Sequence, residues 1–217
     1  WTKAFEKRGI ETVPFQHSNW AYEIKWDSKF IEQAEARSLK NISITCDDKV
    51  KKGEVVITQF GLEGGVIYAL SPQIRKQLNE NKAATIFIDL KPSLTIEEVK
   101  DLLADKGRKS HTKQLKAQLN LNDIEIALLK TILTKDEFIN PEILANKIKQ
   151  LPLQITSMAP IDEAISTVGG IRLNEVDTNF QLKKLPDHYA IGEMLDWDAP
   201  TGGYLLQACF SMGHYLA

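Results

Sequence analysis

The sequence predicts an α+β fold: a β-rich part comes first, a small helical part follows, and a mixed segment ends the chain. Before about position 94, short runs of β-branched or alternating apolar residues are typical of strands, at 20–26, 39–46, 53–58 and 84–90. From Thr95 to about 150 the apolar residues recur at helical spacing. Pro152 then breaks the helical pattern, and glycine turns follow it.

Several short strands separated by turn residues predict an antiparallel sheet or a small barrel. The alternation over 20–26 sets three aromatic residues on one face of a strand, Trp20, Tyr22 and Trp26. These rings could line a substrate cavity, but a buried sheet face explains them more simply. Gly61, Gly64 and Gly65 interrupt the strand pattern, which permits a tight turn or a close approach of two backbones.

The helical part contains recognisable start signals. Thr95 followed by Glu98 is a capping-box pattern, and Asn140 before Pro141 is a favourable helix start. We expect helices at 71–81, 112–119, 123–133 and 141–149. Residues 95–150 are therefore predicted to form a compact helical subdomain held by tertiary packing.

Composition excludes several classes of protein. The chain has 217 residues, 27 basic and 29 acidic side chains and a net charge of -2, which argues against a dedicated nucleic-acid binder. It has neither an apolar run of about 20 residues nor a secretory signal, so we expect a cytoplasmic protein that does not span a membrane. Cys46 and Cys209 are expected to be free thiols, and no Cys/His spacing suggests a metal site.

A basic run at 106–116 leaves one nucleic-acid alternative open. It is more simply a solvated helix start between acidic neighbours. An RNA-binding role would require salt-dependent binding that disappears when Arg108, Lys109 and Lys113 are neutralised.

The most informative stretch is 189–207, which begins as a strand and leads to Gly192 and Glu193. Thr201 can cap the helix that follows, and Gly202 and Gly203 leave its first turn without side chains. The free N–H groups of such a turn, aided by the helix dipole, can face an electron-rich ligand edge. The Glu193 carboxylate can accept two hydrogen bonds from a polyol.

A second glycine-rich stretch precedes it. Residues 164–171 are predicted to be a strand that contains Gly169 and Gly170, where backbone could lie against a flat ring without interference from a Cβ atom.

Both stretches resemble a bacterial family of NAD(P)/FAD-dependent flavoproteins related to aminoacetone oxidase and to bile-acid 3-oxo reductases. The matching residues are Thr-Val-Gly-Gly-Ile at 167–171 and Gly-Glu-Met-Leu-Asp-Trp-Asp-Ala-Pro-Thr-Gly-Gly-Tyr-Leu-Leu-Gln at 192–207. Upstream, Thr-Gln-Phe-Gly-Leu-Glu-Gly-Gly at 58–65 and Ile-Asp-Leu-Lys-Pro at 88–92 resemble the domain that this family inserts into its FAD-binding fold.

The resemblance implies three parts: a barrel-like insert at 1–94, whose first ten or so residues come from the edge of the FAD domain, a helical subdomain at 95–150, and the C-terminal part of a two-dinucleotide-binding flavoprotein fold at 151–217. It also implies FAD as cofactor. Glu193 would hold the ribityl chain, and the backbone N–H groups of Gly203, Tyr204 and Leu205 would stabilise negative charge on the reduced ring.

The sequence departs from the family pattern at several positions, which puts the substrate in question more than the cofactor. Ala199 and Pro200 replace Gly-x, and Leu205 replaces Asn; in the insert motif Gln59, Glu63 and Gly65 replace His, Ser and Pro. No side chain stands out as a catalytic acid or base, and the small-molecule substrate is not identified.

The Gly-x-Gly-x-x-Gly pattern that holds the FAD pyrophosphate does not occur in this sequence. The chain begins with Trp1 and ends within an apolar, helix-like run, so we expect the later part of a longer oxidoreductase that lacks its N-terminal FAD-binding half. Such a piece is expected to be inactive alone. The rival interpretation is a non-catalytic module that binds a ligand or a protein, which a native start at Trp1 would favour.

Overall fold

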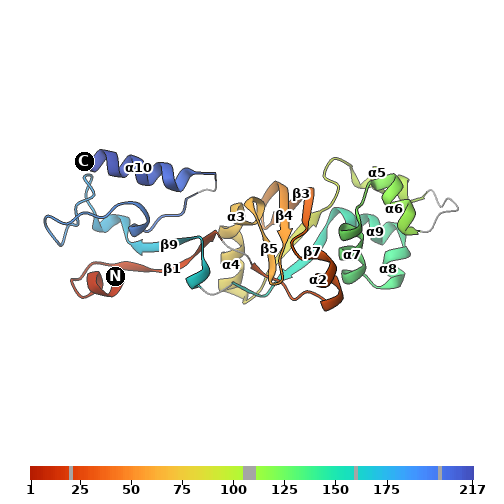
Figure 1. Ribbon diagram of the computed structural model, residues 1–217, viewed down its shortest axis with the longest axis horizontal. Helices are drawn as coiled ribbons and strands as arrows, with labels where there is room; N and C mark the ends of the chain where they lie inside the picture. The colour runs from red at the N-terminus through yellow and green to blue at the C-terminus, as the bar shows by residue number, and fades with distance from the viewer. Residues whose placement is uncertain (20–21, 105–110, 159–160, 200–201) are drawn as a thin grey trace. The chain divides into compact units, whose positions relative to one another are not determined.

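The computed structural model describes residues 1–19, 22–104, 111–158, 161–199 and 202–217. The chain forms two compact units (Figure 1), a terminal unit of residues 1–20 and 159–217 and a central unit of residues 21–158. Helices and antiparallel strands occur together, which confirms the α+β class.

The central unit is built on an antiparallel sheet with the strand order β7-β6-β3-β4-β5-β2-β8. Its strands are β2 (Tyr22–Glu23), β3 (Ser38–Cys46), β4 (Lys49–Ile57), β5 (Gly61–Glu63), β6 (Ala84–Asp89), β7 (Leu151–Ile155) and β8 (Ser157–Met158). The strand expected over 20–26 is shorter than predicted, since only β2 is paired among its described residues.

One segment joins the two edges of this sheet. β7 pairs with β6 and β8 pairs with β2, and Thr156 alone separates β7 from β8. The Thr156 N–H also donates to the carbonyl of Glu23, at 2.9 Å. Because the same stretch of chain pairs with both edges, the sheet closes on itself as a barrel.

This closure differs from the domain boundary expected after residue 150. Pro152 ends the helical pattern, but it lies inside β7, where it pairs with Phe87. Residues 151–158 therefore belong to the central unit, and the boundary follows them. The difference arises because a proline that cannot continue a helix is still compatible with a strand edge.

Gly61 allows the backbones of β5 and β2 to approach closely, as its position in the strand pattern suggested. A Cβ atom at Gly61 would lie 1.8 Å from the carbonyl oxygen of Tyr22, the residue across from Leu62 in the β2–β5 pair. Tyr22 itself is buried in the core, whereas Trp26 is half-buried. Trp20 lies outside the described residues.

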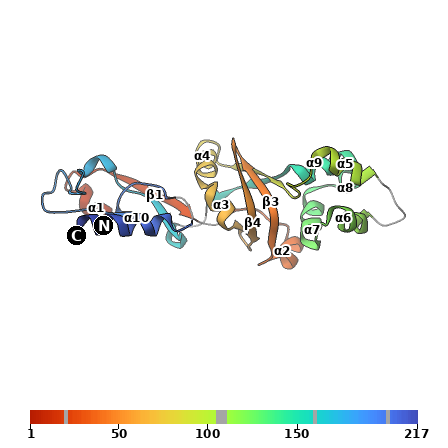
Figure 2. The ribbon, with the colours of Figure 1, turned by 90° about the horizontal axis from the view of Figure 1, so that it is seen from above.

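Helices surround one end of the barrel and cover part of its wall. They are α2 (Ser28–Ala34), α3 (Gly65–Ala69), α4 (Ser71–Asn81), α5 (Ile96–Ala104), α6 (His111–Leu119), α7 (Asp123–Ile132), α8 (Lys135–Ile139) and α9 (Pro141–Lys149). The four expected helices correspond to α4, α6, α7 and α9, within one residue at each end. Figures 1 and 2 show α5 to α9 gathered beside the sheet.

The Ile-Asp-Leu-Lys-Pro stretch at 88–92 is the joint between the sheet and these helices. The Lys149 ammonium of α9 lies 2.7 Å from the Asp89 carboxylate and also donates to the carbonyls of Lys91 and Leu94. The Lys91 ammonium lies 3.3 Å from the carboxylate of Glu125 in α7. Both ion pairs are largely buried, so this motif has a structural function in the central unit.

The terminal unit has much less secondary structure. Strand β1 (Thr12–Asn19) pairs antiparallel with β9 (Ser166–Ile171). The unit also contains α1 (Thr2–Glu6), α10 (Tyr204–Leu216) and the 3-10 turns η1 (Ile161–Glu163), η2 (Leu173–Glu175) and η3 (Gly192–Met194). The expected strand over 189–191 is reduced to an isolated bridge between Gln181 and Tyr189.

The two units differ sharply in how much apolar surface they bury. Among described residues, the core of the terminal unit has six buried apolar side chains, Ile10, Ile171, Val176, Leu182, Ala190 and Leu195. The core of the central unit is several times larger and continuous from the barrel into the helices. The central unit therefore contains most of the buried apolar side chains of the described chain.

Candidate functional site

The two glycine-rich stretches of the terminal unit lie side by side. Leu195 forms a parallel bridge with Ile171 at the end of β9, and the Asp196 N–H donates to the Ile171 carbonyl at 2.7 Å. Segments about 25 residues apart in sequence are thus held together by backbone pairing.

Gly169 and Gly170 are required by the packing of the chain's own backbone. A Cβ atom at Gly169 would lie 2.5 Å from the Pro14 carbonyl oxygen, and one at Gly170 would lie 2.5 Å from that of Met194. Both residues also have positive φ angles, 107° and 115°. Their expected position against a flat ring stays a prediction. The structure gives a different reason for glycine at both positions, because a side chain there would clash with neighbouring backbone.

Gly192 lies under helix α10 and is held by two side chains. Its N–H donates to the Met212 sulfur at 3.3 Å, and its carbonyl accepts the Trp197 indole N–H at 2.9 Å. A Cβ atom there would lie 3.1 Å from the Cys209 sulfur. Trp197 and Met212 were not anticipated as site residues, because no periodic pattern signals a side-chain bond to one particular peptide group.

The next residue, Glu193, is exposed beside this buried glycine. Within the described part of the chain, its carboxylate makes no hydrogen bond or ion pair. Its two oxygens are therefore available to hydroxyl donors of a ligand.

Helix α10 begins two residues later than predicted, at Tyr204, so Gly202 and Gly203 precede its first turn instead of forming it. Gly203 is its N-cap, with φ 91° and ψ -1° and no side-chain cap, and Gly202 has φ 101°. No heavy atom lies within 4 Å of a Cβ position at either glycine. The first intrahelical bond runs from the Gln207 N–H to the Gly203 carbonyl, so the preceding amides, including those of Tyr204 and Leu205, have no intrahelical acceptor. Thr201, the predicted cap, lies outside the described residues.

The remainder of α10 presents an uncovered apolar face. Cys209 and Met212 face η3, whereas Leu206 and Phe210, one turn apart, are 63% and 69% exposed. None of its residues is buried in this chain. Helix α10 therefore leaves large apolar side chains exposed on the terminal unit.

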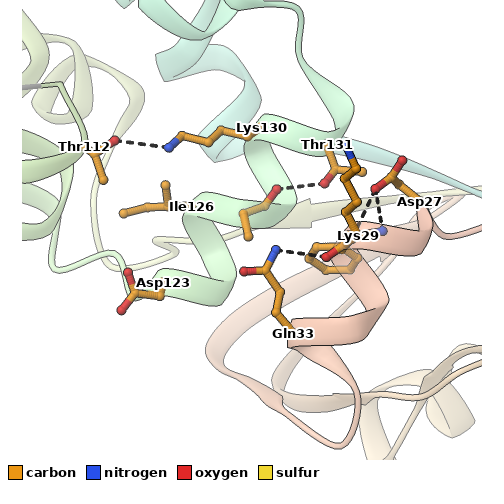
Figure 3. A pocket seen from close by; sticks show the side chains of 10 residues that line it. Asp27, Lys29, Gln33, Thr112, Asp123, Ile126, Lys130 and Thr131 are labelled. Carbon is orange, nitrogen blue, oxygen red and sulfur yellow. Dashed lines mark hydrogen bonds between the residues drawn. The ribbon is translucent and has the colours of Figure 1, made fainter.

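Two cavities lined by described residues lie in the central unit. A cavity of about 570 Å³ lies between α2 and α7 (Figure 3), and the buried side chains Phe30 and Ile126 are among the residues that line it. Its polar groups already serve the fold: Asp27 caps α2, and the Lys130 ammonium donates to Thr112. This cavity therefore gives no argument for a ligand.

A second cavity, of about 450 Å³, tests the alternative that the aromatic residues line a cavity. Trp26 lines it together with Ile132 and Leu153, but its indole N–H is already used by the Thr58 carbonyl. Tyr22, by contrast, is a core residue. The buried-face interpretation thus holds for Tyr22, and Trp26 also packs against the same core, so a substrate cavity lined by these rings stays a prediction.

The described residues include no cluster of three His, Cys, Asp or Glu side chains that could hold a metal ion. No helix of the described chain is long and apolar enough to cross a membrane. Both cysteines are free, as expected, with Cys46 buried and Cys209 half-buried. Of the basic run at 106–116, Arg108 and Lys109 lie outside the described residues.

The comparisons with known proteins support a domain related to flavin-dependent oxidoreductases. A family model described as "HI0933-like protein barrel and H2TH domain" matches residues 18–166, so the chain belongs to the HI0933-like family. This match spans the whole central unit, and confirms the resemblance to a flavoprotein family noted from the sequence motifs.

A curated relative is the 3-dehydro-bile acid delta(4,6)-reductase of Clostridium scindens, which is 27% identical over 176 residues. The alignment covers 76% of this chain and 43% of the reductase. The chain thus matches less than half the length of this relative.

Proposed function

We propose that this chain supplies the substrate-side domain and the flavin-ring and ribityl contacts of an FAD-dependent oxidoreductase. The observation that carries the proposal is the start of α10: two glycines with positive φ angles, and no heavy atom of the described chain within 4 Å of a Cβ position at either one. Such a surface presents free amides to a flat, electron-rich ligand edge. The membership of the family and the reductase relative support the same class.

The residues of the terminal unit fit FAD in separate ways. Glu193 accepts hydrogen bonds from the ribityl hydroxyls, because its carboxylate is exposed and uncommitted among the described residues. The amides of Gly203, Tyr204 and Leu205 face the ring edge, where the helix dipole favours negative charge. Bound FAD supplies the electron-transfer chemistry, and these groups orient it.

The exposed apolar side chains of α10 fit a longer protein, in which another segment of the chain covers them. Leu206 and Phe210 lie against the missing N-terminal FAD-binding half, which holds the pyrophosphate. The substrate is a small molecule in an NAD(P)H-, amine- or carbonyl-linked reaction in the cytoplasm. The chain alone is inactive, because it keeps the flavin contacts without the phosphate contacts.

Absorbance spectroscopy tests this proposal. The full-length protein is expected to be yellow, with a flavin band, and the present chain to be colourless and unable to oxidise NADPH with oxygen. Glu193→Ala is expected to weaken FAD binding about tenfold or more, because it removes hydrogen bonds to a charged acceptor. Glu32→Ala, an exposed glutamate of α2, is the control and is expected to bind FAD normally. A yellow preparation of the chain alone, or normal affinity in Glu193→Ala, contradicts this division of roles.

A further inference from the structure

Two side chains hold the peptide groups on either side of Gly192, the residue before the proposed ribityl ligand. The Trp197 indole N–H donates to the Gly192 carbonyl at 2.9 Å, a distance typical of a good hydrogen bond. The Met212 sulfur accepts the Gly192 N–H at 3.3 Å. The carbonyl also accepts the Leu195 N–H at 3.2 Å, so the Trp197 bond is an addition to the ordinary closure of the turn.

The same glycine is enclosed by α10. Cys209 and Met212 are three residues apart on one face of the helix, and both contact Gly192. Gly192 has φ 64°, a conformation that favours glycine, and it is buried. Glu193, in contrast, is exposed. The backbone is therefore fixed where the following carboxylate emerges from the surface.

We propose that Trp197 and Met212 are positioning residues, which fix the Gly192 backbone and thereby direct the Glu193 carboxylate toward the ribityl chain. This inference rests on the proposed function. Fixing the backbone before ligand arrives lowers the entropy that must be lost on binding. Neither side chain is assigned a contact with the flavin, so both act through Glu193.

The first experiment measures FAD affinity in the full-length protein by quenching of flavin fluorescence. Trp197→Phe keeps an aromatic ring and removes the donor, and we expect it to raise the dissociation constant about threefold to tenfold. Trp26→Phe is the matched control: it removes an indole bond to a backbone carbonyl, 3.1 Å to Thr58, in the central unit. We expect the control to change FAD affinity less than twofold.

A double-mutant cycle separates positioning from a general structural effect. If Trp197 acts through Glu193, Trp197→Phe should change FAD affinity less than twofold once Glu193→Ala is present. A merely structural role would give the same factor in both backgrounds. Met212→Leu, which keeps the shape and removes the sulfur acceptor, provides a second variant should Trp197→Phe not fold, and is expected to show the same dependence on Glu193.

The outcomes distinguish this inference from the function on which it rests. If Glu193→Ala binds FAD normally, the ribityl role and the positioning inference both fail. If Glu193→Ala weakens binding but Trp197→Phe and Met212→Leu leave affinity within twofold, only the positioning inference is overturned. Equal effects of Trp197→Phe with and without Glu193 overturn it as well.

Discussion

The close approach of Gly61 to the Tyr22 backbone gives a sharp test of how the barrel closes. Gly61→Ala places a Cβ atom 1.8 Å from the Tyr22 carbonyl oxygen, whereas real contacts of this kind are at least 3.0 Å. The backbones of β2 and β5 must therefore separate by more than about 1 Å. Because β2 also pairs with β8, this movement disturbs the segment that closes the sheet.

The expected loss of stability in Gly61→Ala follows from the backbone hydrogen bonds between β2 and β5. The Ile24 N–H donates to the Phe60 carbonyl at 2.8 Å, and the described residues of β2 pair with β5 as Tyr22–Leu62 and Glu23–Gly61. Loss of two or three backbone bonds at about 1 kcal/mol each, with partial exposure of buried Tyr22, predicts about 3–5 kcal/mol of destabilisation. Urea unfolding followed by circular dichroism measures this free energy.

Gly65→Ala is the matched control, four residues further along the same motif. No heavy atom lies within 4 Å of a Cβ position at Gly65, the first residue of α3. Alanine is a good helix former, so we expect a change within about 0.5 kcal/mol. The reasoning is refuted if Gly61→Ala costs less than 1 kcal/mol, or if the two variants are equally stable.

Three further predictions concern ion pairs, thiols and acid stability. Lys149→Met should cost about 3–5 kcal/mol of unfolding free energy, because it leaves a largely buried carboxylate without its ion-pair partner. Lys100→Met removes a more exposed ion pair and should cost much less; equal losses would contradict this. Burial raises the pKa of the Cys46 thiol to about 11. A thiol reagent at pH 8 should therefore label the half-buried Cys209 first and Cys46 only after unfolding. Rapid labelling of both cysteines in the folded protein would contradict this prediction. The hydrogen bond from the Thr95 backbone N–H lowers the pKa of the Glu98 carboxyl. The stability that the ionised Glu98 adds to the fold is therefore present above the ordinary pKa of 4.5 and is lost as pH falls through the lowered folded pKa. Glu98→Gln should flatten the acid side of the plot of stability against pH, and an unchanged plot would refute this.

The longer helices could be predicted because their signals are local. Asn140 caps α9 with its side chain and Pro141 occupies the first turn, as the sequence indicated. The five-residue helix α8 was missed, although Thr134 and Glu137 form a full capping box, because one turn is too short to show periodicity.

The limits of the barrel were harder to predict, because they depend on pairing between distant segments. Nothing near Leu151 indicates that residues 151–158 pair with both β6 and β2. Pro152 is an accurate signal for the end of α9 and a misleading one for the end of the unit. Local signals such as proline and capping residues thus predicted the ends of helices better than the boundary between the two units.

The candidate site divides in the same way. The open start of α10 follows from Gly202 and Gly203 alone, because helix-end chemistry is local. The contacts of Trp197 and Met212 with Gly192 depend on how α10 packs on η3, which no spacing encodes. The sequence therefore indicated the glycines before α10 but not the two side chains that bind the Gly192 backbone, and the ligand contacts stay a prediction.

The most direct measurement compares FAD affinity in the full-length protein for Gly203→Ala and Gly9→Ala. Both glycines have positive φ angles, 91° and 75°, and open space at the Cβ position, so the backbone strain of the two substitutions is similar. If the start of α10 meets the flavin, Gly203→Ala loses FAD affinity at least tenfold while Gly9→Ala retains it. Equal affinities in the two variants would contradict the account.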